Sequence, residues 1–274
     1  MLRPLEVPYR YLFGPGPSNV SPRVLSAGGR PIIGHLHPEM YEIMNDIKEG
    51  IRYAFQTNNH MTLAMSGSGH TAMECAVFNI VEPGESVLVS INGVWGERVA
   101  EIAERMDIDI LYTGSQKALN APPGTAPISF NERACQKMFN RKSKPVSYLL
   151  DMSHLSNYWG NDGKPARMYH HTGPVSGFFT LRESLAILAE KGLENSWRQH
   201  REVAEYLWKG LEDLGLQLFI KDKDLRLPSV TTIAIPDGYD WKELLAYIMK
   251  HHQMEMTGGL GPSIGMVRRT RLIG

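Results

Sequence analysis

Short apolar strands alternate with helices between residues 62 and 106, and this alternation constrains the fold more than any other feature. The apolar run 62–66 is followed by a Gly-Ser-Gly turn, and helical spacing begins at Thr71. Residues 86–91 form a second apolar run, followed by a helix that is predicted to end near Met106. Consecutive strands that are joined by helices run in the same direction in one sheet. The sequence therefore predicts an α/β domain with a mainly parallel sheet.

Composition narrows the class of protein and of partner. The chain has 274 residues, 42% of them hydrophobic, and its 29 basic and 29 acidic groups cancel. These values are typical of a globular protein with one or two domains, and zero net charge excludes the electrostatic footprint of a nucleic-acid or anionic-membrane binder. The sequence contains no stretch of the length of a membrane span. Cys75 and Cys135 are too few for a disulfide framework, so we expect packing residues in a reducing compartment.

Periodicity predicts further elements on both sides of this alternation. Helical spacing occurs in three other stretches, 38–55, 181–214 with a turn inside it, and 241–251. Strands are expected at four places, 108–112, the residues before Phe130, 231–235 and 267–273. The first two of these strands are expected to pair like a hairpin. We predict a large domain over residues 1–173 and a smaller α+β domain over residues 174–274.

Lys117 is the strongest candidate for chemistry. It follows the apolar stretch 108–112 and stands in the run Gly-Ser-Gln-Lys-Ala-Leu, residues 114–119. A lysine at the end of a buried strand, flanked by small hydroxyl and amide side chains, can lose its proton and form an imine with an aldehyde. This is the chemistry of a pyridoxal phosphate enzyme. The alternative is an ordinary surface lysine.

The turn Ser66-Gly67-Ser68-Gly69-His70, between a strand and a helix, is typical of a phosphate site. The glycines let the backbone approach, and the unpaired N–H groups and positive end of the helix face an anion. The alternative is a turn whose glycines serve steric needs only. The third glycine and acidic residue of a dinucleotide fingerprint are absent from the sequence, as is the lysine and hydroxyl pair of a P-loop.

Three other segments can contribute to a binding site. Trp95, in a tight Asn-Gly-Val-Trp-Gly turn, can stack on a planar ring, or be a partly buried loop residue. An arginine of the cluster Arg268, Arg269 and Arg271 can hold a carboxylate with its guanidinium group, or the cluster can be a solvated strand edge. The Gly- and Pro-rich loop 12–18 can bring its backbone close to a ligand.

Metal and serine-hydrolase chemistry are not expected. The histidines that stand close together in the sequence do not provide three ligands at helical or hairpin spacing with an open position: His35 with His37, His170 with His171, and His251 with His252. The sequence also contains no Gly-x-Ser-x-Gly elbow.

Six segments, in one order along nearly the whole chain, carry a resemblance to a known family. They are residues 12–19, 66–70, 92–98, 114–124, 167–172 and 258–263. Together they closely resemble the alanine-glyoxylate and serine-pyruvate aminotransferases, which are class V pyridoxal phosphate enzymes of fold type I. A lyase or desulfurase of the same fold type is the weaker match, because those enzymes lack the Arg-Met-Tyr-His-His-Thr run of residues 167–172. The resemblance implies fold type I for this chain.

The resemblance also implies a role for each motif residue around pyridoxal 5'-phosphate. Lys117 matches the Schiff-base lysine. The cofactor-binding residues of the same subunit match a phosphate cup, a neighbouring amide and a stacking ring, namely Ser68, Gly69, His70, Gln116 and Trp95. Tyr169 and Thr172 resemble the pair that reaches the phosphate of the neighbouring subunit, which implies a homodimer.

The same resemblance implies the substrates. Arg269 matches the arginine that binds the substrate carboxylate, and Gly14 is assigned to the substrate site. The implied reaction transfers the amino group of alanine or serine to glyoxylate or pyruvate, with Lys117 moving the proton, in glyoxylate detoxification. We expect small amino acids and 2-oxo acids as partners, and no nucleic acid or membrane. The implied compartment is the peroxisome, with the mitochondrion as the alternative, although we expect no targeting signal in this chain.

Two departures separate the chain from the family pattern. Family members carry several dozen more residues between positions 106 and 107, including the aspartate that pairs with the pyridine nitrogen, and Asp109 does not replace it. They also continue beyond Gly274, so we expect both domains to be incomplete. Without that aspartate the cofactor is a poor electron sink. The alternative function is therefore a catalytically impaired isoform or fragment that acts at most as a dimer partner, and the gap favours it for the chain as written.

Overall fold

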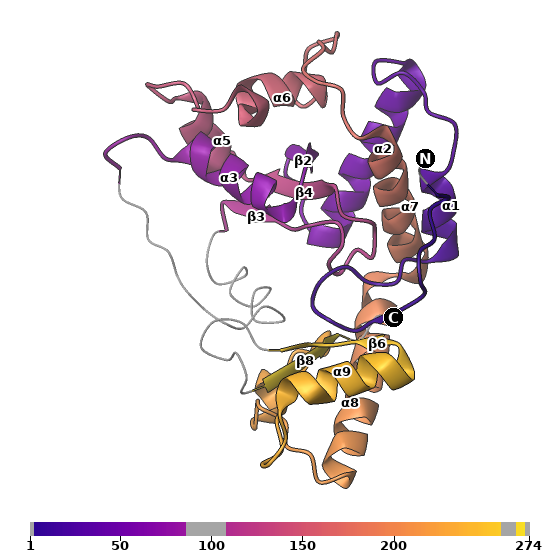
Figure 1. Ribbon diagram of the computed structural model, residues 1–274. Helices are drawn as coiled ribbons and strands as arrows, with labels where there is room; N and C mark the ends of the chain where they lie inside the picture. The colour runs from indigo at the N-terminus through magenta and orange to yellow at the C-terminus, as the bar shows by residue number, and fades with distance from the viewer. Residues whose placement is uncertain (1–2, 86–107, 259–266, 272–274) are drawn as a thin grey trace. The chain divides into compact units, whose positions relative to one another are not determined.

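A computed structural model describes residues 3–85, 108–258 and 267–271 (Figure 1). These residues form two compact units, which are Val20–Leu193, here the large unit, and Met1–Asn19 with Glu194–Gly274, here the small unit. The units differ from the predicted domains in two places. The chain between residues 174 and 193 belongs to the large unit, and the first 19 residues belong to the small one. The predicted strand 86–91 and the helix to Met106 lie outside the described residues.

A three-stranded sheet forms the centre of the large unit. Its strands are β2 (Met61–Ser66), β4 (Thr125–Phe130) and β3 (Ile110–Tyr112), in the order β2-β4-β3. Both pairs are antiparallel, with Met61 and Ile110 each opposite Phe130, so the predicted hairpin of β3 and β4 is confirmed. The described strands of this sheet pair antiparallel, because β4 returns between β2 and β3, which run in the same direction as each other. The strand 86–91, which the sequence places in parallel with β2, lies outside the described residues.

Helices surround this sheet in the large unit, and they include one whose bounds the sequence predicted. They are α1 (Pro22–Gly28), α2 (Pro38–Phe55), α3 (Gly69–Ile80), α5 (Glu132–Phe139), α6 (Met152–Tyr158) and α7 (Val175–Lys191), with a 3-10 turn at Tyr148–Leu150. Helix α2 begins at a proline, whose fixed φ suits the first helical position, and ends at Gln56 in the left-handed conformation. The predicted helical stretch 181–214 is two helices, because Gly192, at φ +83°, separates α7 from α8 (Leu193–Asp213).

Helices α2 and α7 lie side by side in the large unit (Figure 1). Their close approach depends on Gly50, because a Cβ atom at this position would lie 2.8 Å from Leu185 Cβ. Contacts this short do not occur between real side chains without a shift of one helix. The missing side chain of Gly50 therefore sets how closely α7 packs on α2.

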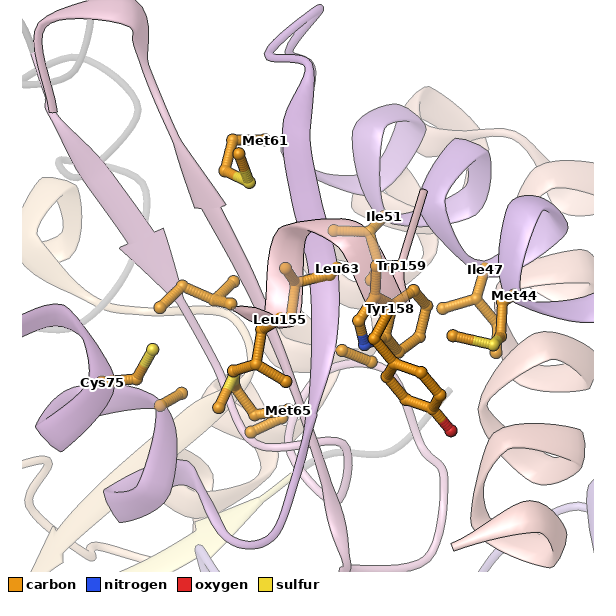
Figure 2. Close-up of a cluster of buried hydrophobic side chains, with 14 of the residues drawn as sticks. Met44, Ile47, Ile51, Met61, Leu63, Met65, Cys75, Leu155, Tyr158 and Trp159 are labelled. Atoms are coloured by element: carbon orange, nitrogen blue, oxygen red, sulfur yellow. The ribbon is translucent and has the colours of Figure 1, made fainter. Parts of the chain in front are cut away.

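The large unit has a continuous apolar core (Figure 2). Side chains from α2, β2, α3 and α6 meet there, among them Met44, Ile47, Ile51, Leu63, Met65, Cys75, Leu155 and Trp159. All six residues of β4 are buried, so both faces of this strand are covered. Cys75 is a packing residue as predicted, and burial raises the pKa of its thiol to about 12.

The small unit contains two further sheets. Strands β1 (Tyr11–Leu12) and β6 (Met254–Glu255) pair in parallel. Strands β5 (Val230–Ala234), β8 (Val267–Arg271) and β7 (Thr257–Gly258) form an antiparallel sheet in the order β5-β8-β7. The predicted strands 231–235 and 267–273 and the helix 241–251 correspond to β5, β8 and α9 (Trp241–His252), and a 3-10 turn spans Lys223–Leu225. The core here is small, with Ala204, Trp208, Leu218 and Ile233 buried.

Candidate active site

The turn that follows β2 is held in place by its own backbone. Gly67 has φ +143°, a conformation that favours glycine, and its N–H donates to the Gly124 carbonyl at 3.0 Å. Thr71 Oγ1 accepts from the Ser68 N–H at 3.1 Å, in the first turn of α3. The Ser68 and His70 side chains are exposed. The turn therefore presents a hydroxyl, an imidazole and the positive end of a 12-residue helix at one place.

The loop that carries Lys117 lies between β3 and β4 and is anchored by Ser115. The Ser115 N–H donates to the Thr125 carbonyl at 3.0 Å, and its buried hydroxyl donates to the Pro122 carbonyl at 2.6 Å. Two successive turns hold the lysine itself: its N–H donates to the Gly114 carbonyl at 3.1 Å, and its carbonyl accepts from the Asn120 N–H at 3.0 Å. Lys117 is exposed, so its side chain leaves a fixed backbone at the surface of the loop.

The turn 67–70, here called the phosphate turn after its predicted role, and the loop 113–124, here the lysine loop, are adjacent, although 45 positions separate Gly69 from Gly114 in the sequence. A Cβ atom at Gly69 would lie 3.5 Å from the Gly114 nitrogen and 3.6 Å from its Cα. The side chain of Gln116 folds back over Gly114, since a Cβ there would lie 2.6 Å from Gln116 Oε1. This arrangement fits a ligand that bears both a phosphate and an aldehyde, because backbone amides and a helix start can bind an anion and the loop that carries a lysine lies beside them.

The segment 169–172 also lies beside this turn. His171 Nε2 is 2.6 Å from the Oγ atom of Ser66, the last residue of β2. Tyr169 and Thr172 are exposed, and the Tyr169 ring packs against His35 with 5.3 Å between the ring centres. The structure thus brings together four of the predicted elements in the large unit: the phosphate turn, Gln116, Lys117 and the Tyr169 to Thr172 segment.

The remaining predicted site residues lie elsewhere. Trp95 is outside the described residues. The Gly14 N–H donates to Glu255 Oε2 at 2.8 Å within the small unit, and a Cβ atom there would collide with the Glu255 carboxylate. Arg269 lies in β8, opposite Thr232 of β5 and Thr257 of β7. Arg269 is therefore part of the central strand of its sheet, and its role at the substrate carboxylate stays a prediction.

Burial controls the charge of the groups near the turn. Burial, together with the neighbouring His170 and His35, lowers the pKa of His171 to about 4. Burial also lowers the pKa of His170. Both rings are therefore neutral at neutral pH. Asp109 is engaged elsewhere: its two carboxylate oxygens accept from Arg133 Nε and Nη2 at 2.6 and 2.7 Å, and these hydrogen bonds lower its pKa.

Metal-ligating side chains do not gather into larger groups in the part of the chain that the structure describes. Over residues 3–85, 108–258 and 267–271, no group of three or more His, Cys, Asp or Glu side chains could hold a metal ion. Across the same ranges, no helix has the length and apolar character needed to cross a bilayer.

Comparison with known proteins identifies the family. The family model described as "Aminotransferase class-V" matches residues 102–270 of this chain. The chain is 48% identical to an alanine–glyoxylate aminotransferase of Felis catus, over all of this chain and 85% of that protein. It is 37% identical to the Drosophila melanogaster enzyme of the same name, over 99% of this chain and 89% of that protein. The chain belongs to the class V aminotransferases. Pyridoxal phosphate is the cofactor of this family, whose members act on amino and 2-oxo acids.

Solved structures agree with this assignment. A Nostoc alanine–glyoxylate aminotransferase, 34% identical, has a TM-score of 0.91 over 100% of this chain and 92% of that one. The ureidoglycine–glyoxylate aminotransferase of Bacillus subtilis, 26% identical, has a TM-score of 0.90 over 99% of this chain and 89% of that one. The predicted fold type I is therefore confirmed.

The same comparisons bear on the alternative of an impaired fragment. The alignment with the Felis catus protein spans 353 positions against the 274 residues of this chain, so about 79 positions face no residue here. The placement of that gap between positions 106 and 107 stays a prediction, because both residues lie outside the described ranges. The relatives nevertheless support the transaminase function, and the impaired form is not supported over it.

Sequence reasoning did not assign a function to three residues beside the turn. Ser66, His170 and His171 were read as parts of motifs, or as a histidine pair that lacks a third metal ligand. Their meeting joins residues 105 positions apart, which no local spacing reveals. The only available signal was the presence of two adjacent histidines next to Tyr169 and Thr172.

Proposed function

We propose that this chain transfers the amino group of alanine or serine to glyoxylate or pyruvate, with pyridoxal phosphate as cofactor. The observation that carries the proposal is the meeting of the turn 67–70 with the loop of Lys117. Two relatives named alanine–glyoxylate aminotransferase, at 48% and 46% identity, support the choice of substrates. In this proposal the substrate carboxylate binds Arg269, and Gly14 lies at the same substrate site.

The residues of this chain divide the work between binding and proton transfer. Ser68, Gly69 and His70 hold the cofactor phosphate at the start of α3, and Gln116 lies beside them. When bound, pyridoxal phosphate supplies an aldehyde that accepts the amino group and a ring that withdraws electrons. Lys117 Nζ takes the proton from the α-carbon of the amino acid, because it is the primary amine next to the phosphate turn.

Titration of the purified protein with pyridoxal phosphate tests this assignment. We expect a visible absorption band at a wavelength that free cofactor lacks, and we expect Lys117→Ala to abolish it. Lys164→Ala, which removes an exposed lysine that pairs with Asp162, should leave the band unchanged. Adding alanine should bleach the band, and glyoxylate should restore it. A band that alanine leaves unchanged would contradict the transaminase function and favour the impaired form.

We further propose that the protein is a homodimer in the peroxisome, where it takes part in glyoxylate detoxification. The exposure of Tyr169 and Thr172 supports the dimer, since in this proposal the two side chains reach the phosphate of a neighbouring subunit. Sedimentation velocity of the cofactor-loaded protein measures the mass directly. The compartment rests on the family resemblance alone, and imaging of the tagged full-length protein against peroxisomal and mitochondrial markers tests it.

A further inference from the structure

A chain of hydrogen bonds runs from the phosphate turn into the large unit. Ser66 Oγ lies 2.6 Å from His171 Nε2, and His171 Nδ1 lies 2.8 Å from His170 Nδ1. At the far end, His170 Nε2 lies 3.2 Å from the Tyr148 carbonyl oxygen. The Tyr148 ring also stacks on His170, with 4.9 Å between the ring centres and 7° between the planes. Four residues from three separate stretches of sequence are therefore linked in one line.

The direction of every bond in this line follows from its far end. A carbonyl oxygen only accepts, so His170 Nε2 carries a proton and donates it to Tyr148. Because the His170 ring is neutral, its Nδ1 atom accepts, and His171 Nδ1 must donate. His171 is neutral as well, so its Nε2 atom accepts from the Ser66 hydroxyl. One arrangement of protons satisfies all three contacts, and it fixes the tautomer of both histidines.

The line joins the phosphate turn to the segment that, in the proposed dimer, reaches the phosphate of the neighbouring subunit. Ser66 is the last residue of β2 and leads directly into the turn Gly67-Ser68-Gly69. His171 stands between Tyr169 and Thr172. The segment 169–172 is thus held against the end of β2 by the polar contact of His171 with Ser66. Gly173, directly after the segment, packs tightly on Phe178, because a Cβ atom there would lie 2.5 Å from Phe178 Cε2.

We propose that Ser66, His171 and His170 are positioning residues that hold the Tyr169 to Thr172 segment in register with the phosphate turn. Neither histidine touches the cofactor in this proposal, which rests on the proposed function. The three residues act through the backbone: Ser66 fixes the start of the turn, and His171 fixes the segment. Loss of the line therefore weakens cofactor binding without removing any group that contacts the phosphate.

Nitrogen NMR of the cofactor-free protein tests the line itself. The chain has 10 histidines, and ¹⁵N-histidine labelling distinguishes the two neutral tautomers by their ring-nitrogen shifts. We expect one ring that is protonated at Nδ1 and absent from the spectrum of His171→Phe. We also expect a ring protonated at Nε2 that Ser66→Ala leaves in place and His170→Phe removes. A His171 ring protonated at Nε2 at neutral pH would overturn the proposal.

Affinity for pyridoxal phosphate tests the positioning role. Ser66→Ala and His171→Phe should each raise the apparent Kd about tenfold, the effect of one lost hydrogen bond of ordinary strength. Ser66→Thr keeps the hydroxyl and should restore most of the affinity. Two matched controls should keep the wild-type Kd: Ser156→Ala removes a buried hydroxyl in α6, and His60→Phe removes a histidine that contacts the Asn161 carbonyl.

The outcomes separate the inference from the function on which it rests. Unchanged Kd in Ser66→Ala and His171→Phe, with normal binding by the wild type, would overturn the positioning role and leave the transaminase function standing. A wild type that takes up no pyridoxal phosphate would overturn both. Equal losses in Ser66→Ala and Ser156→Ala would show that any lost buried hydroxyl has this effect, and would also overturn the inference. A thermal melt of each cofactor-free variant identifies one that fails to fold, and Ser66→Ala then serves as the smallest change.

Discussion

Strand β4 of the large unit and strand β5 of the small unit are covered to different degrees. In the large unit all six residues of β4 are buried, so helices and neighbouring strands cover both faces. In the small unit β5 alternates, with Thr231 and Ile233 buried and Val230, Thr232 and Ala234 partly exposed. The core of the large unit is correspondingly extended, while four of the described residues form the buried cluster of the small unit. The phosphate turn and the lysine loop are therefore supported by the more deeply buried of the two cores. The predictions below test this contrast between the units.

The largest effect is expected from the core of the large unit. Trp159 is 1% exposed and meets the Phe178 ring edge-on at 5.4 Å. Trp159→Ala should lower the free energy of unfolding by about 3–5 kcal/mol, because it leaves a cavity in a close-packed core. Hydrogen exchange should quicken in β2 and β4 and stay unchanged in β5. Trp197→Ala is the control, since Trp197 is 51% exposed, and an equal loss there would remove the contrast.

A second, pH-dependent effect is expected from Lys48, which is 7% exposed in the same core and donates to the Trp159 carbonyl at 2.9 Å. Burial, with Arg167 and Arg52 nearby, lowers its pKa to about 8. Between pH 8 and the ordinary lysine value of 10.5 the unfolded chain holds a proton that the folded one lacks, so the stability of the wild type rises with pH.

Lys48→Met removes this titration. The rise, on the order of 1–3 kcal/mol, should be absent from the variant, so that the difference in stability between wild type and variant grows with pH in urea unfolding at several pH values. Lys164→Met, at an exposed lysine, should keep the rise. A slope that is the same in both variants would show that Lys48 titrates normally.

A smaller effect is expected in the small unit. Trp208 Nε1 donates to the buried Thr231 hydroxyl at 2.8 Å. Thr231→Val leaves the indole N–H without its acceptor and should cost about 1–2 kcal/mol. Exchange should quicken in β5 and α8 only, and Thr232→Val, on the other face of the same strand, should have little effect. Faster exchange in β2 or β4 would mean that the two cores are not independent.

The smallest effect is expected from the exposed pair of Asp109 and Arg133 in the large unit. Asp109→Asn should change stability by less than about 1 kcal/mol at neutral pH, because solvent and salt screen such pairs. The pKa of Asp109 is lowered, so its contribution is present above the ordinary carboxyl pKa and is lost as pH falls through the lowered value. Denaturant unfolding at low and high salt measures the difference. A loss of stability as large as that of Trp159→Ala would show that the pair of Asp109 and Arg133 stabilises the large unit as much as its apolar core does.

Long or proline-started elements of the fold could be predicted from the sequence. Helix α2 was found with both ends, because Pro38 starts it and its apolar residues recur over five turns. The short helices α1, α5 and α6 were missed, since seven or eight residues give no period. The caps were the available signal: Asn131 accepts from the Ala134 N–H, and Asp151 accepts from the Ser153 N–H.

Strand direction was harder to predict than strand position. The hairpin of β3 and β4 was predicted, yet the insertion of β4 beside β2 was not, because pairing between residues 61 and 130 leaves no local pattern. The site divides in the same way. Lys117 and the turn at Ser68 were found from their own neighbours in sequence. The contact of His171 with Ser66 depends on how α7 and its preceding segment pack, which only the folded chain shows.

The close packing of α7 on α2 at Gly50 restricts which residues can occur at two positions in related sequences. The missing side chain of Gly50 lets α7 lie against α2 at Leu185, and α7 begins only three residues after Thr172. A larger residue at position 50 is tolerated only with a smaller one at position 185. Among relatives, the two positions should therefore covary, although neither side chain carries a polar group or approaches the phosphate turn.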